Sequence, residues 1–559
     1  MIGTNSSSSF CDSSGLLRIC AERSAEEFIV PITAETNSSC RSGQARGAQP
    51  KRSLQTSPYG FRGLPRELLV FVVMVASECA LVAQAGGLAD VVFGLSRELE
   101  LRGNDVEVIL PRYDCMRYDH IHGLWPAYDD LWVPWYSGAV HCSVWFGFVE
   151  GRKCFFIEPH CADRFFERGH FYGSADDVER FAFFSKAALE FILKSGKRPQ
   201  VIHCHDWQTA LVPVLLFEIY QHIGLGDQRV CYTVHNFSHQ GVCGEPVLWA
   251  TGLCSPERFY DYNRLRDNLN PSAINLMKGG IVYSNFVTTV SPQHAWEVRH
   301  TDQGMGLWHT LEVHQGKFGG ILNGVDYSVW NPEIDGLIPR RYGPDRLDDK
   351  YANKQALRDR FWLRQDYKPI VAYIGRVDRQ KGVHLIHHSI FYALAQGAQF
   401  VLIGSSPDPA IAAHFWHLKQ HLNDNQDCHL ELGFSVELAH LTYAGADLLV
   451  MPSMFEPCGL AQMIALKYGT VPIVRAIGGL VDTVFDRDYS SHPPEQRNGY
   501  VFHQVDNPAL ESAMARAIGL WYAYPQEFRY LQLNGMRADH SWTWPAQHYL
   551  DIYQHIRHK

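Results

Sequence analysis

Hydrophobic and polar positions alternate along this chain in a pattern that predicts repeated strand–helix units. The uninterrupted apolar run at residues 68–76 predicts a strand that is buried on both faces. Residues 88–102 carry apolar side chains three and four positions apart, which is the spacing of one helix face, and a second apolar run follows at 106–110. Strand, helix and strand in this order form a βαβ unit, the building block of a parallel sheet.

The same alternation continues in two series that meet near residue 319. In the first series we expect helices at 181–193 and 210–220, and strands at 201–204, 230–234 and 287–290. In the second we expect a helix at 383–395 and strands at 370–374, 400–403, 429–432, 448–451 and 471–474. Two series of buried parallel strands predict an α/β protein with two doubly wound, Rossmann-like domains that face each other across a cleft.

The domain boundaries follow from these series. We expect the first domain at residues 67–318, the second at 319–535, and a helical segment at 536–559 that packs back on the first domain. Residues 1–66 are rich in Ser, Gly and Arg and have no periodicity, so they are predicted to be a disordered extension. Acids such as Asp12 and Glu22 argue against a transit peptide. We therefore expect a cytoplasmic protein, with a plastid location as the alternative if residues 1–66 are a transit peptide.

Composition excludes several classes of partner. The net charge of −9 and the pI near 6.3 argue against nucleic acid as a partner. The longest apolar run stops at Glu78, short of the ~20 residues that a membrane-spanning helix needs. Fourteen cysteines without a Cys-x-x-Cys pair are typical of free thiols in a reducing compartment. His203 and His205 flank Cys204, but no further ligand at the right spacing completes a zinc set, so we expect both histidines to be packed or hydrogen-bonded. We expect no metal site and no cofactor.

The candidate chemistry lies where predicted strands end. Glu456 occupies a tight turn after the strand that ends at Met451, and glycine-rich turns that expose backbone N–H groups to an anion occur at 86–87, 459 and 478–479. Arg376 and Lys381 follow another strand and can together bind a diphosphate. The alternative is that both are ordinary cations of a solvated turn.

Two further strand ends carry polar side chains. Asp206 and Trp207 follow the strand at 201–204 and place a carboxylate beside an aromatic ring, an arrangement suited to a sugar. His235 and Asn236 follow the strand at 230–234, where a purely structural turn is the alternative. The carboxyl ends of parallel strands share one edge of a sheet, so these pairs are predicted to lie close together.

Taken together, these segments resemble the glycogen and starch synthases over about residue 68 to the C-terminus. The resemblance rests on six segments in the family's order: Ala85-Gly86-Gly87-Leu88-Ala89-Asp90, His205-Asp206-Trp207, Tyr232-Thr233-Val234-His235-Asn236, Gly320-Ile321-Leu322-Asn323-Gly324-Val325-Asp326, Glu456-Pro457-Cys458-Gly459-Leu460 and Gly478-Gly479-Leu480. The run from Asn236 to Gly241 is most similar to cyanobacterial second-type glycogen synthases and plant starch synthases III and IV.

The resemblance implies a fold and an activity. Family members are retaining glucosyltransferases of the GT-B fold. They transfer glucose from ADP-glucose, less often UDP-glucose, to the non-reducing 4-hydroxyl group of an α-1,4-glucan, and they require no metal. Partners are therefore expected to be the nucleotide sugar and the glucan, with no nucleic acid and no membrane.

The resemblance also implies residue roles. Catalysis is assigned to Glu456, His235 and Asp206, and acceptor binding to Trp207 and Asn236. Because no side chain is placed as a covalent nucleophile, we expect substitution on one face of the sugar, in which the departing phosphate helps to deprotonate the acceptor. Donor binding is assigned to a larger set: Gln84, Gly86, Gly87, Arg376, Lys381, Phe434, Cys458, Gly459, Leu460, Gly478 and Gly479.

One position departs from the family pattern. The first family motif is usually Lys-x-Gly-Gly-Leu, whereas this chain has Gln84 in place of the lysine. Losing one contact to a charge that develops in the transition state costs about 10²–10³ in rate. The alternative function is therefore a glucan-binding or priming scaffold with weak or no catalysis. A glucan phosphorylase shares the fold but needs a lysine-bound pyridoxal phosphate, which nothing in the sequence indicates.

Overall fold

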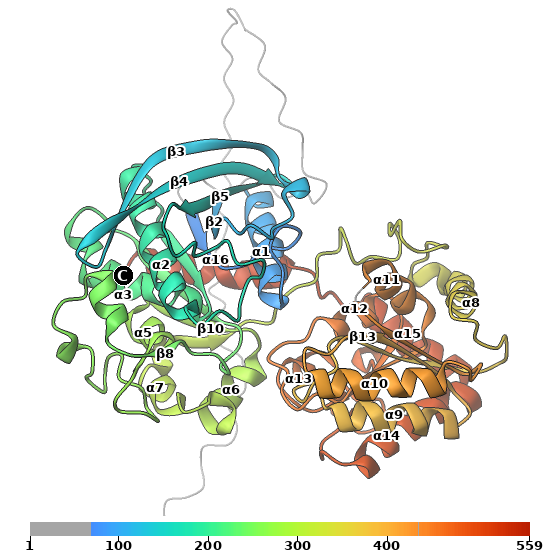
Figure 1. Cartoon of the computed structure of the whole chain (residues 1–559). Helices are drawn as coiled ribbons and strands as arrows, with labels where there is room; N and C mark the ends of the chain where they lie inside the picture. Colours follow the sequence, from blue (N-terminus) through green and yellow to red (C-terminus); the bar gives the residue numbers. More distant parts are fainter. Residues whose placement is uncertain (1–68, 434) are drawn as a thin grey trace, which may run out of the picture. The chain divides into compact units, whose positions relative to one another are not determined.

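The computed structural model describes residues 69–433 and 435–559 (Figure 1). The predictions made for residues 1–66 and for Phe434 fall outside the described residues.

The first domain is built on a nine-stranded sheet with the order β11-β10-β7-β6-β1-β2-β5-β4-β3. Its parallel part contains β1 (Phe71–Val75), β2 (Asp105–Pro111), β5 (Arg152–Pro159), β6 (Val201–His205), β7 (Arg229–Val234), β10 (Phe286–Thr289) and β11 (Phe318–Gly320). Its helices are α1 (Gly87–Leu101), α2 (Asp177–Lys194), α3 (Leu211–Glu218), α4 (Pro246–Thr251), α5 (Leu276–Tyr283), α6 (Pro292–His300) and α7 (Trp308–Val313). A short ribbon of β8 (Val242–Cys243) and β9 (Ile274–Asn275) stands apart from the main sheet.

Two long antiparallel strands, β3 (His122–Trp135) and β4 (Gly138–Val149), extend this sheet beyond β5. The sequence pattern did not predict them. Their register shifts at three places, and β3 contains Pro126 and Pro134. These irregularities break the strict alternation of polar and apolar positions from which a half-buried strand is read.

The second domain has a six-stranded, fully parallel sheet with the order β14-β13-β12-β15-β16-β17. The strands are β12 (Ile370–Ile374), β13 (Gln399–Gly404), β14 (Cys428–Leu432), β15 (Leu448–Met451), β16 (Val471–Arg475) and β17 (Tyr500–Phe502). Its helices are α8 (Lys350–Arg360), α9 (Val383–Ala395), α10 (Pro409–Leu422), α11 (Val436–Gly445), α12 (Ala461–Lys467), α13 (Gly479–Thr483), α14 (Asn507–Ala523) and α15 (Pro525–Arg537). The predicted architecture of two doubly wound α/β domains is confirmed.

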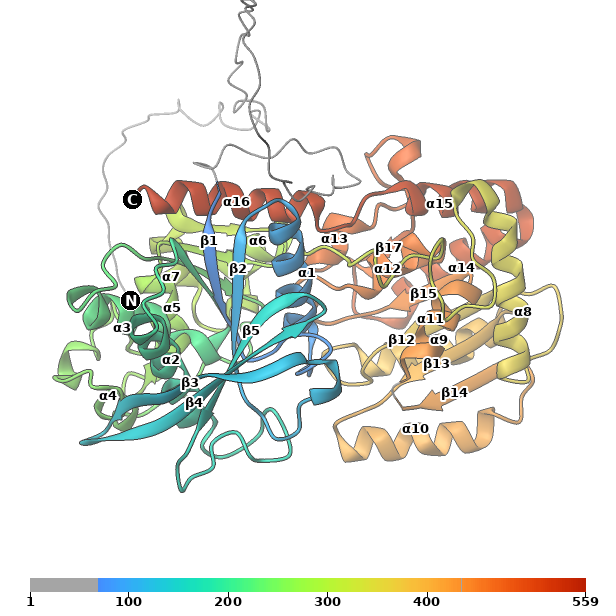
Figure 2. The same cartoon turned by 90° about the horizontal axis from the view of Figure 1, so that it is seen from above.

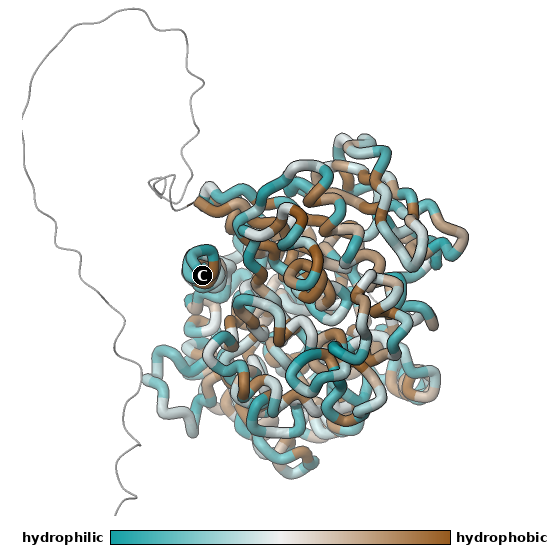
Figure 3. The backbone as a smooth tube through the Cα atoms, turned by 90° about the vertical axis from the view of Figure 1, so that its left-hand side faces the viewer, coloured by the Kyte–Doolittle hydropathy of each residue, from teal (hydrophilic) through white to brown (hydrophobic). Residues whose placement is uncertain are grey.

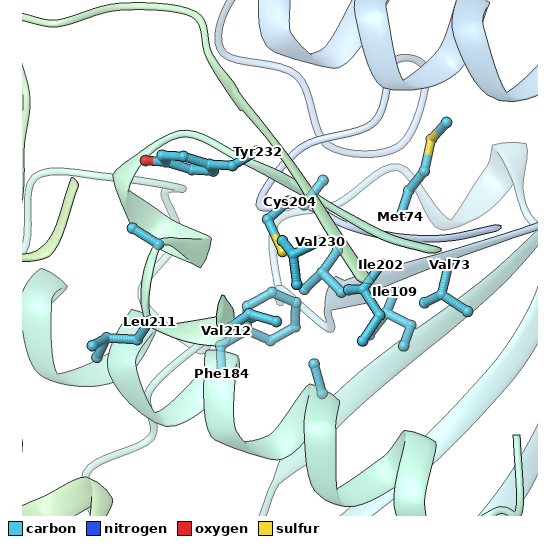
Figure 4. Close-up of a cluster of buried hydrophobic side chains, with 14 of the residues drawn as sticks. Val73, Met74, Ile109, Phe184, Ile202, Cys204, Leu211, Val212, Val230 and Tyr232 are labelled. Carbon is cyan, nitrogen blue, oxygen red and sulfur yellow. The ribbon is translucent and has the colours of Figure 1, made fainter. Parts of the chain in front are cut away.

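Buried aliphatic and aromatic side chains hold each sheet to its helices. In the first domain, Val73, Ile202 and Val230 from three neighbouring strands pack with Phe184 of α2 and Val212 of α3 (Figure 4). Hydrophobic segments of the backbone gather toward the interior, whereas many outer loops are hydrophilic (Figure 3). The strands are apolar on both faces because helices cover both faces of a parallel sheet.

The last helix of the chain, α16 (Thr543–Arg557), packs on the first domain (Figure 2). It contacts α1 and β7, and Trp542, Tyr549 and Tyr553 are buried in the first domain's core. The hydroxyl group of Tyr553 lies 2.7 Å from Nδ1 of His203 on β6. The end of the chain therefore completes the core that the first strands begin.

Candidate active site

A cavity of about 820 Å³ lies where the carboxyl ends of the two sheets meet. This is the position at which open parallel sheets bind ligands. It brings together most of the residues singled out from the sequence: Gly86, Gly87, Asp206, Trp207, His235 and Asn236 from the first domain, and Arg376, Lys381, Glu456, Cys458, Gly459 and Leu460 from the second. Gln84, Gly478 and Gly479 are not part of its lining.

The glycine turn between β1 and α1 forms one wall of the cavity. A Cβ atom added at Gly86 or Gly87 would meet no protein atom within 4 Å, so the fold itself does not require glycine here. The missing side chains leave open the wall in front of α1, whose first turn presents backbone N–H groups and the positive end of the helix dipole. This geometry suits close approach of a phosphate group.

Glu78 shapes this turn, although sequence reasoning treated it only as the end of an apolar run. Its Oε2 atom accepts hydrogen bonds from the N–H groups of Ala85 (2.6 Å) and Gly86 (2.9 Å). Its Oε1 atom accepts one from the hydroxyl group of Tyr172 (2.6 Å), which also lines the cavity. The signal available in the sequence was a lone carboxylate that directly follows a buried strand.

Gln84 belongs to the same turn but faces Asp90 of α1. Its Nε2 atom lies 3.3 Å from both carboxylate oxygens of Asp90. Burial and the neighbouring Glu78 raise the pKa of Asp90 to about 7. Asp90 lines the cavity, so a residue at position 84 influences the cavity through the Asp90 carboxyl group.

Asp206 fixes the turn that follows β7. Its Oδ1 atom accepts hydrogen bonds from the N–H groups of His235 (2.6 Å) and Asn236 (3.3 Å). The residue has φ +56° and ψ −177°, a backbone conformation that is costly for a residue other than glycine and that often marks a functional site. Burial raises the pKa of its carboxyl group to about 7, against the effect of the two N–H donors.

His235 is hydrogen-bonded to His205, the last residue of β6. Nε2 of His235 lies 3.1 Å from Nδ1 of His205, and both rings are buried. Burial lowers the pKa of His235 to about 3 and that of His205 well below its usual value, so both imidazoles are neutral at working pH. His235 lines the cavity, and because its Nε2 atom is engaged by His205, Nδ1 is the ring nitrogen left for a ligand.

Lys381 and Glu456 form the polar wall of the second domain. The Lys381 ammonium group lies 2.6 Å from Oε2 of Glu456, which also accepts a hydrogen bond from the hydroxyl group of Ser453 (2.8 Å). Arg376 sits beside them, 3.1 Å from Asp378, with half of its side chain exposed. Two cations thus border the cavity, and one of them is tied to the carboxylate that the sequence placed in the turn.

The loop that carries Glu456 is braced from two sides. The guanidinium group of Arg475 on β16 donates to the carbonyl oxygens of Ser453 (2.9 Å) and Met454 (3.1 Å). The N–H group of Met454 donates to the carbonyl of Gln380, which joins this loop to the loop that carries Lys381. These bonds restrict how far Glu456 and Lys381 can separate.

Gly478 and Gly479 contact this loop and are not part of the cavity lining, so their role as donor contacts stays a prediction. The N–H group of Gly479 donates to the carbonyl oxygens of Glu456 and Pro457. A Cβ atom at Gly478 would lie 2.0 Å from the carbonyl oxygen of Glu456, so only glycine fits. Their N–H groups are used within the protein, so these glycines hold the Glu456 turn in place.

Helix α6 of the first domain and its N-cap residue form hydrogen bonds to the same region of the second domain. The Ser291 hydroxyl group donates to the carbonyl of Pro457 (2.6 Å), and the N–H group of Gly478 donates to Glu297 (2.9 Å). The N–H group of Gln293 donates to Asp482 (2.9 Å). Three polar contacts therefore link one helix of the first domain to the two turns that carry Glu456 and Gly478.

Two searches of the described residues were negative. Residues 69–433 and 435–559 contain no group of three or more His, Cys, Asp or Glu side chains arranged to hold a metal ion. Within the same ranges, no helix has the length and apolar character required to cross a membrane.

Comparisons with known proteins agree with this geometry. Residues 71–313 match the family described as starch synthase catalytic domain, and residues 356–528 match glycosyl transferases group 1. Glycogen synthase 1 of Synechococcus sp. (strain JA-3-3Ab) is 64% identical over 491 residues, which cover 88% of this chain and 100% of that protein. Glycogen synthase 2 of Methylococcus capsulatus is 63% identical over 485 residues, 87% of this chain and 100% of that protein.

Two solved structures share the architecture. The catalytic domain of starch synthase IV from Arabidopsis thaliana, bound to ADP and acarbose, superimposes with a TM-score of 0.85 at 41% identity and covers 88% of this chain and 100% of that one. Sucrose-phosphate synthase from Thermosynechococcus elongatus shares the fold with a TM-score of 0.53 at 20% identity and covers 87% of this chain and 98% of that one.

Fold and cavity therefore define a glycosyltransferase of the GT-B class, as predicted. At 64% and 63% identity over the whole length of these two relatives, the chain belongs to the glycogen synthase family, the enzymes of glycogen and starch synthesis.

Proposed function

We propose that this chain transfers glucose from ADP-glucose to the non-reducing 4-hydroxyl group of an α-1,4-glucan, with retention of the anomeric configuration. The observation that carries the proposal is the cavity itself. A wall with Arg376, Lys381 and Glu456 from the second domain faces a wall with Asp206, Trp207 and His235 from the first. An adenine nucleotide as donor is supported by the ADP found in the Arabidopsis relative.

In this proposal the second domain binds the donor. Arg376 provides a forked guanidinium group and Lys381 a point charge for the diphosphate, while the open glycine turn and the start of α1 approach the same phosphates. Lys381 has three N–H donors, so it can keep its bond to Glu456 and still contact a phosphate oxygen. Glu456, together with the backbone of residues 458–460, orients the glucose hydroxyl groups.

The first domain positions the acceptor. Trp207 offers an aromatic face to the terminal sugar of the glucan, and Asn236 borders the same site. Asp206 keeps the turn of His235 and Asn236 in place through its two backbone contacts. His235 hydrogen-bonds the transferred glucose as a neutral imidazole, near its 6-hydroxyl group.

The proposed reaction needs no protein nucleophile. The bond between C1 of glucose and the β-phosphate oxygen breaks while the acceptor's 4-oxygen bonds to C1 from the same face. The proton of the 4-hydroxyl group passes to the departing phosphate oxygen. The protein's contribution is positioning and stabilisation of the charge on the leaving ADP by Arg376 and Lys381.

The test is incorporation of labelled glucose into glycogen from ADP-glucose and UDP-glucose, side by side. We expect faster incorporation from ADP-glucose, in a product that an α-1,4-specific exo-amylase removes completely. Absence of incorporation from either donor, with glycogen still bound, would favour a glucan-binding scaffold. Faster incorporation from UDP-glucose would overturn the choice of donor.

A cytoplasmic location is part of the same proposal. The cysteines of the described residues are all free thiols, which is typical of proteins in a reducing compartment. The plastid alternative depends on residues 1–66, which lie outside the described residues.

A further inference from the structure

A second cavity, of about 460 Å³, lies in the second domain at the edge of the sheet opposite to the candidate active site. Its lining includes Lys368 and Asp447, which come just before β12 and β15, so the cavity borders the amino ends of these strands. Helices α8, α14 and α15 supply much of the remaining lining (Figure 2). No described residue lines both cavities. A cavity of this size is large enough for a small ligand.

One face of α8 contributes three cationic side chains to this cavity. Lys350, Lys354 and Arg358 are spaced four residues apart, which places them on the same side of the helix, and all three are buried. Lysine and arginine side chains are rarely buried unless they are paired. The partners of these three cations therefore decide what the cavity can bind.

The two lysines already have partners. The Lys350 ammonium group donates hydrogen bonds to four oxygen atoms of the protein, and burial lowers the pKa of Lys350 to about 7. The Lys354 ammonium group lies 2.6 Å from Oδ2 of Asp447 and donates to the carbonyl oxygen of Lys368 (2.8 Å). An ammonium group has three N–H donors, so Lys354 retains one for a further acceptor.

Arg358 has no counter-ion. Its Nε atom donates to Oε1 of Gln399 (2.9 Å) and its Nη2 atom to the carbonyl oxygen of Lys368 (3.0 Å), and both acceptors are neutral. Within residues 69–433 and 435–559, no carboxylate forms an ion pair with Arg358, and its Nη1 atom has no hydrogen-bond partner. A guanidinium group is always charged, and a buried charge without a counter-ion is costly. An anion in the cavity would supply the missing negative charge.

The other charged side chains of the lining do not supply it, because they are engaged elsewhere. They form three further ion pairs: Arg529 with Asp348, Lys368 with Asp427, and Asp366 with Arg364. Arg358 is therefore the charge that a ligand can compensate.

Aromatic rings lie at the same cavity. Tyr367 is 70% exposed, and its ring lies 4.6 Å from that of Trp521 on α14. The Lys354 ammonium group lies 4.7 Å from the Trp521 ring, so the rings and the cations are adjacent. An exposed aromatic ring can stack on a nucleobase, and a guanidinium group binds phosphate through parallel N–H donors. Rings and cations together suit a ligand that has both a base and a phosphate.

We propose that this cavity is a second nucleotide-binding site, in which Arg358 and Lys354 contact the phosphate groups and Tyr367 stacks on the base. The inference goes beyond the proposed function, because no residue of the candidate active site takes part in it. ADP is the probe of this ligand class, since it is also the leaving group of the proposed reaction.

The first experiment counts ADP sites on the full chain by titration calorimetry. The native chain should bind two ADP molecules. Lys381→Ala should weaken only the site at the candidate active site, and Tyr367→Ala should weaken only the other, by roughly 5- to 100-fold, the effect of losing a stacked base. Trp362→Ala is the matched control, because Trp362 is 76% exposed in the same connection between α8 and β12 but does not line the cavity. One ADP per native chain, bound equally well by Tyr367→Ala, would overturn the proposal.

The second experiment tests the charge. Arg358→Gln should weaken the site that Tyr367→Ala affects by at least ~10-fold, the effect of losing a charged hydrogen bond, and Arg358→Lys should recover part of the loss. Tyr367 is exposed, so Tyr367→Ala keeps the proposal testable if Arg358→Gln does not fold. Binding of inorganic phosphate that depends on Arg358, with ADP binding unaffected by Tyr367→Ala, would assign the cavity to a simple anion and overturn the nucleotide as its ligand.

These measurements also separate the inference from the proposed function, because ADP binding requires no transfer of glucose. A chain that incorporates no glucose but loses one ADP site in Tyr367→Ala would keep the second site and reject the proposed synthase activity. A chain that incorporates glucose and binds a single ADP, through Lys381 alone, would do the reverse.

Discussion

Lys381 and Glu456 form an ion pair of 2.6 Å that joins two loops at the carboxyl edge of the second sheet. Both residues line the cavity, and the braced loop around Glu456 keeps the pair in place. A carboxylate in this position can orient sugar hydroxyl groups while its partner contacts a phosphate. In the proposed function, the pair would couple recognition of the sugar to recognition of the leaving group.

Glu456→Ala should reduce kcat by at least ~10²-fold, because the transferred glucose loses its orienting carboxylate. The measurement is the rate of transfer from ADP-glucose to glycogen, with the unfolding midpoint as a check on the fold. Glu511→Ala is a suitable control, since Glu511 pairs with His388 at 2.7 Å outside the cavity. Near-native activity of Glu456→Ala would mean that the active site lies elsewhere.

Gln84→Lys should raise kcat/KM for ADP-glucose several-fold, because it restores a cation in the glycine turn; a charged hydrogen bond there contributes ~1.5–3 kcal/mol. The new ammonium group would lie beside Asp90 and lower the pKa of that carboxyl group from about 7. Gln84→Met keeps the length without the charge and is the control. Unchanged kinetics would show that Arg376 and Lys381 already satisfy the diphosphate.

Asp90→Asn should stabilise the protein at pH 8 and have little effect at pH 4. Burial raises the pKa of Asp90 from 3.8 to about 7 in the folded chain, so the folded state binds more protons than the unfolded state between these values. The contribution of Asp90 to the free energy of unfolding therefore falls as the pH rises from about 4 to about 7, and it is constant above pH 7. Urea unfolding at pH 4, 6 and 8 measures the effect, with the exposed Asp424→Asn as control. An equal effect at all three pH values would contradict the raised pKa.

Tyr553→Phe should destabilise the first domain by about 1–3 kcal/mol, because it leaves Nδ1 of buried His203 without its partner. Tyr489→Phe removes a hydroxyl group from a side chain that is 77% exposed and should have almost no effect. Denaturant unfolding of the two variants gives the comparison. Equal stability of both would mean that α16 contributes through its apolar contacts alone.

Removal of residues 1–66 should leave transfer activity unchanged. The relatives from Synechococcus and Methylococcus are matched over their full length by 88% and 87% of this chain, and the starch synthase match begins at residue 71. The rate of glucose incorporation by the shortened chain measures this directly. A marked loss of activity or of folding yield would assign the segment a role in the enzyme.

Most of the parallel strands could be predicted from the sequence, because buried parallel strands are continuously apolar. The predicted ranges 370–374, 383–395 and 448–451 are the bounds of β12, α9 and β15. The parallel strands β5, β11 and β17 were not predicted; β11 and β17 have only three residues each, too few for a pattern. The strands β3 and β4 could not be found in this way, because their burial is one-sided and their register is irregular.

The residues of the candidate site also divide into those that the sequence could predict and those that it could not. Strand ends pointed to Glu456, Lys381 and Asp206, since the edge of a parallel sheet gathers them regardless of sequence distance. Glu78 was missed, and the sequence indicated for His205 only a packed or hydrogen-bonded histidine without its partner, because both roles depend on contacts in three dimensions. The Glu78 carboxylate accepts hydrogen bonds from two N–H groups of a turn, and the His205 imidazole hydrogen-bonds to that of His235. Neither contact can be read from the spacing of residues along the sequence.

The placement of α16 has a consequence for the synthesis of the chain. The first domain is translated early, but the helix that fills its core between α1 and β7 follows the second domain in the sequence. At ~5–20 residues per second, translation of the second domain takes on the order of 10 to 45 seconds. During that interval the nascent first domain exposes the apolar face that α16 covers. Emergence of α16 from the ribosome, and not the assembly of the first sheet, is the event that closes the first core.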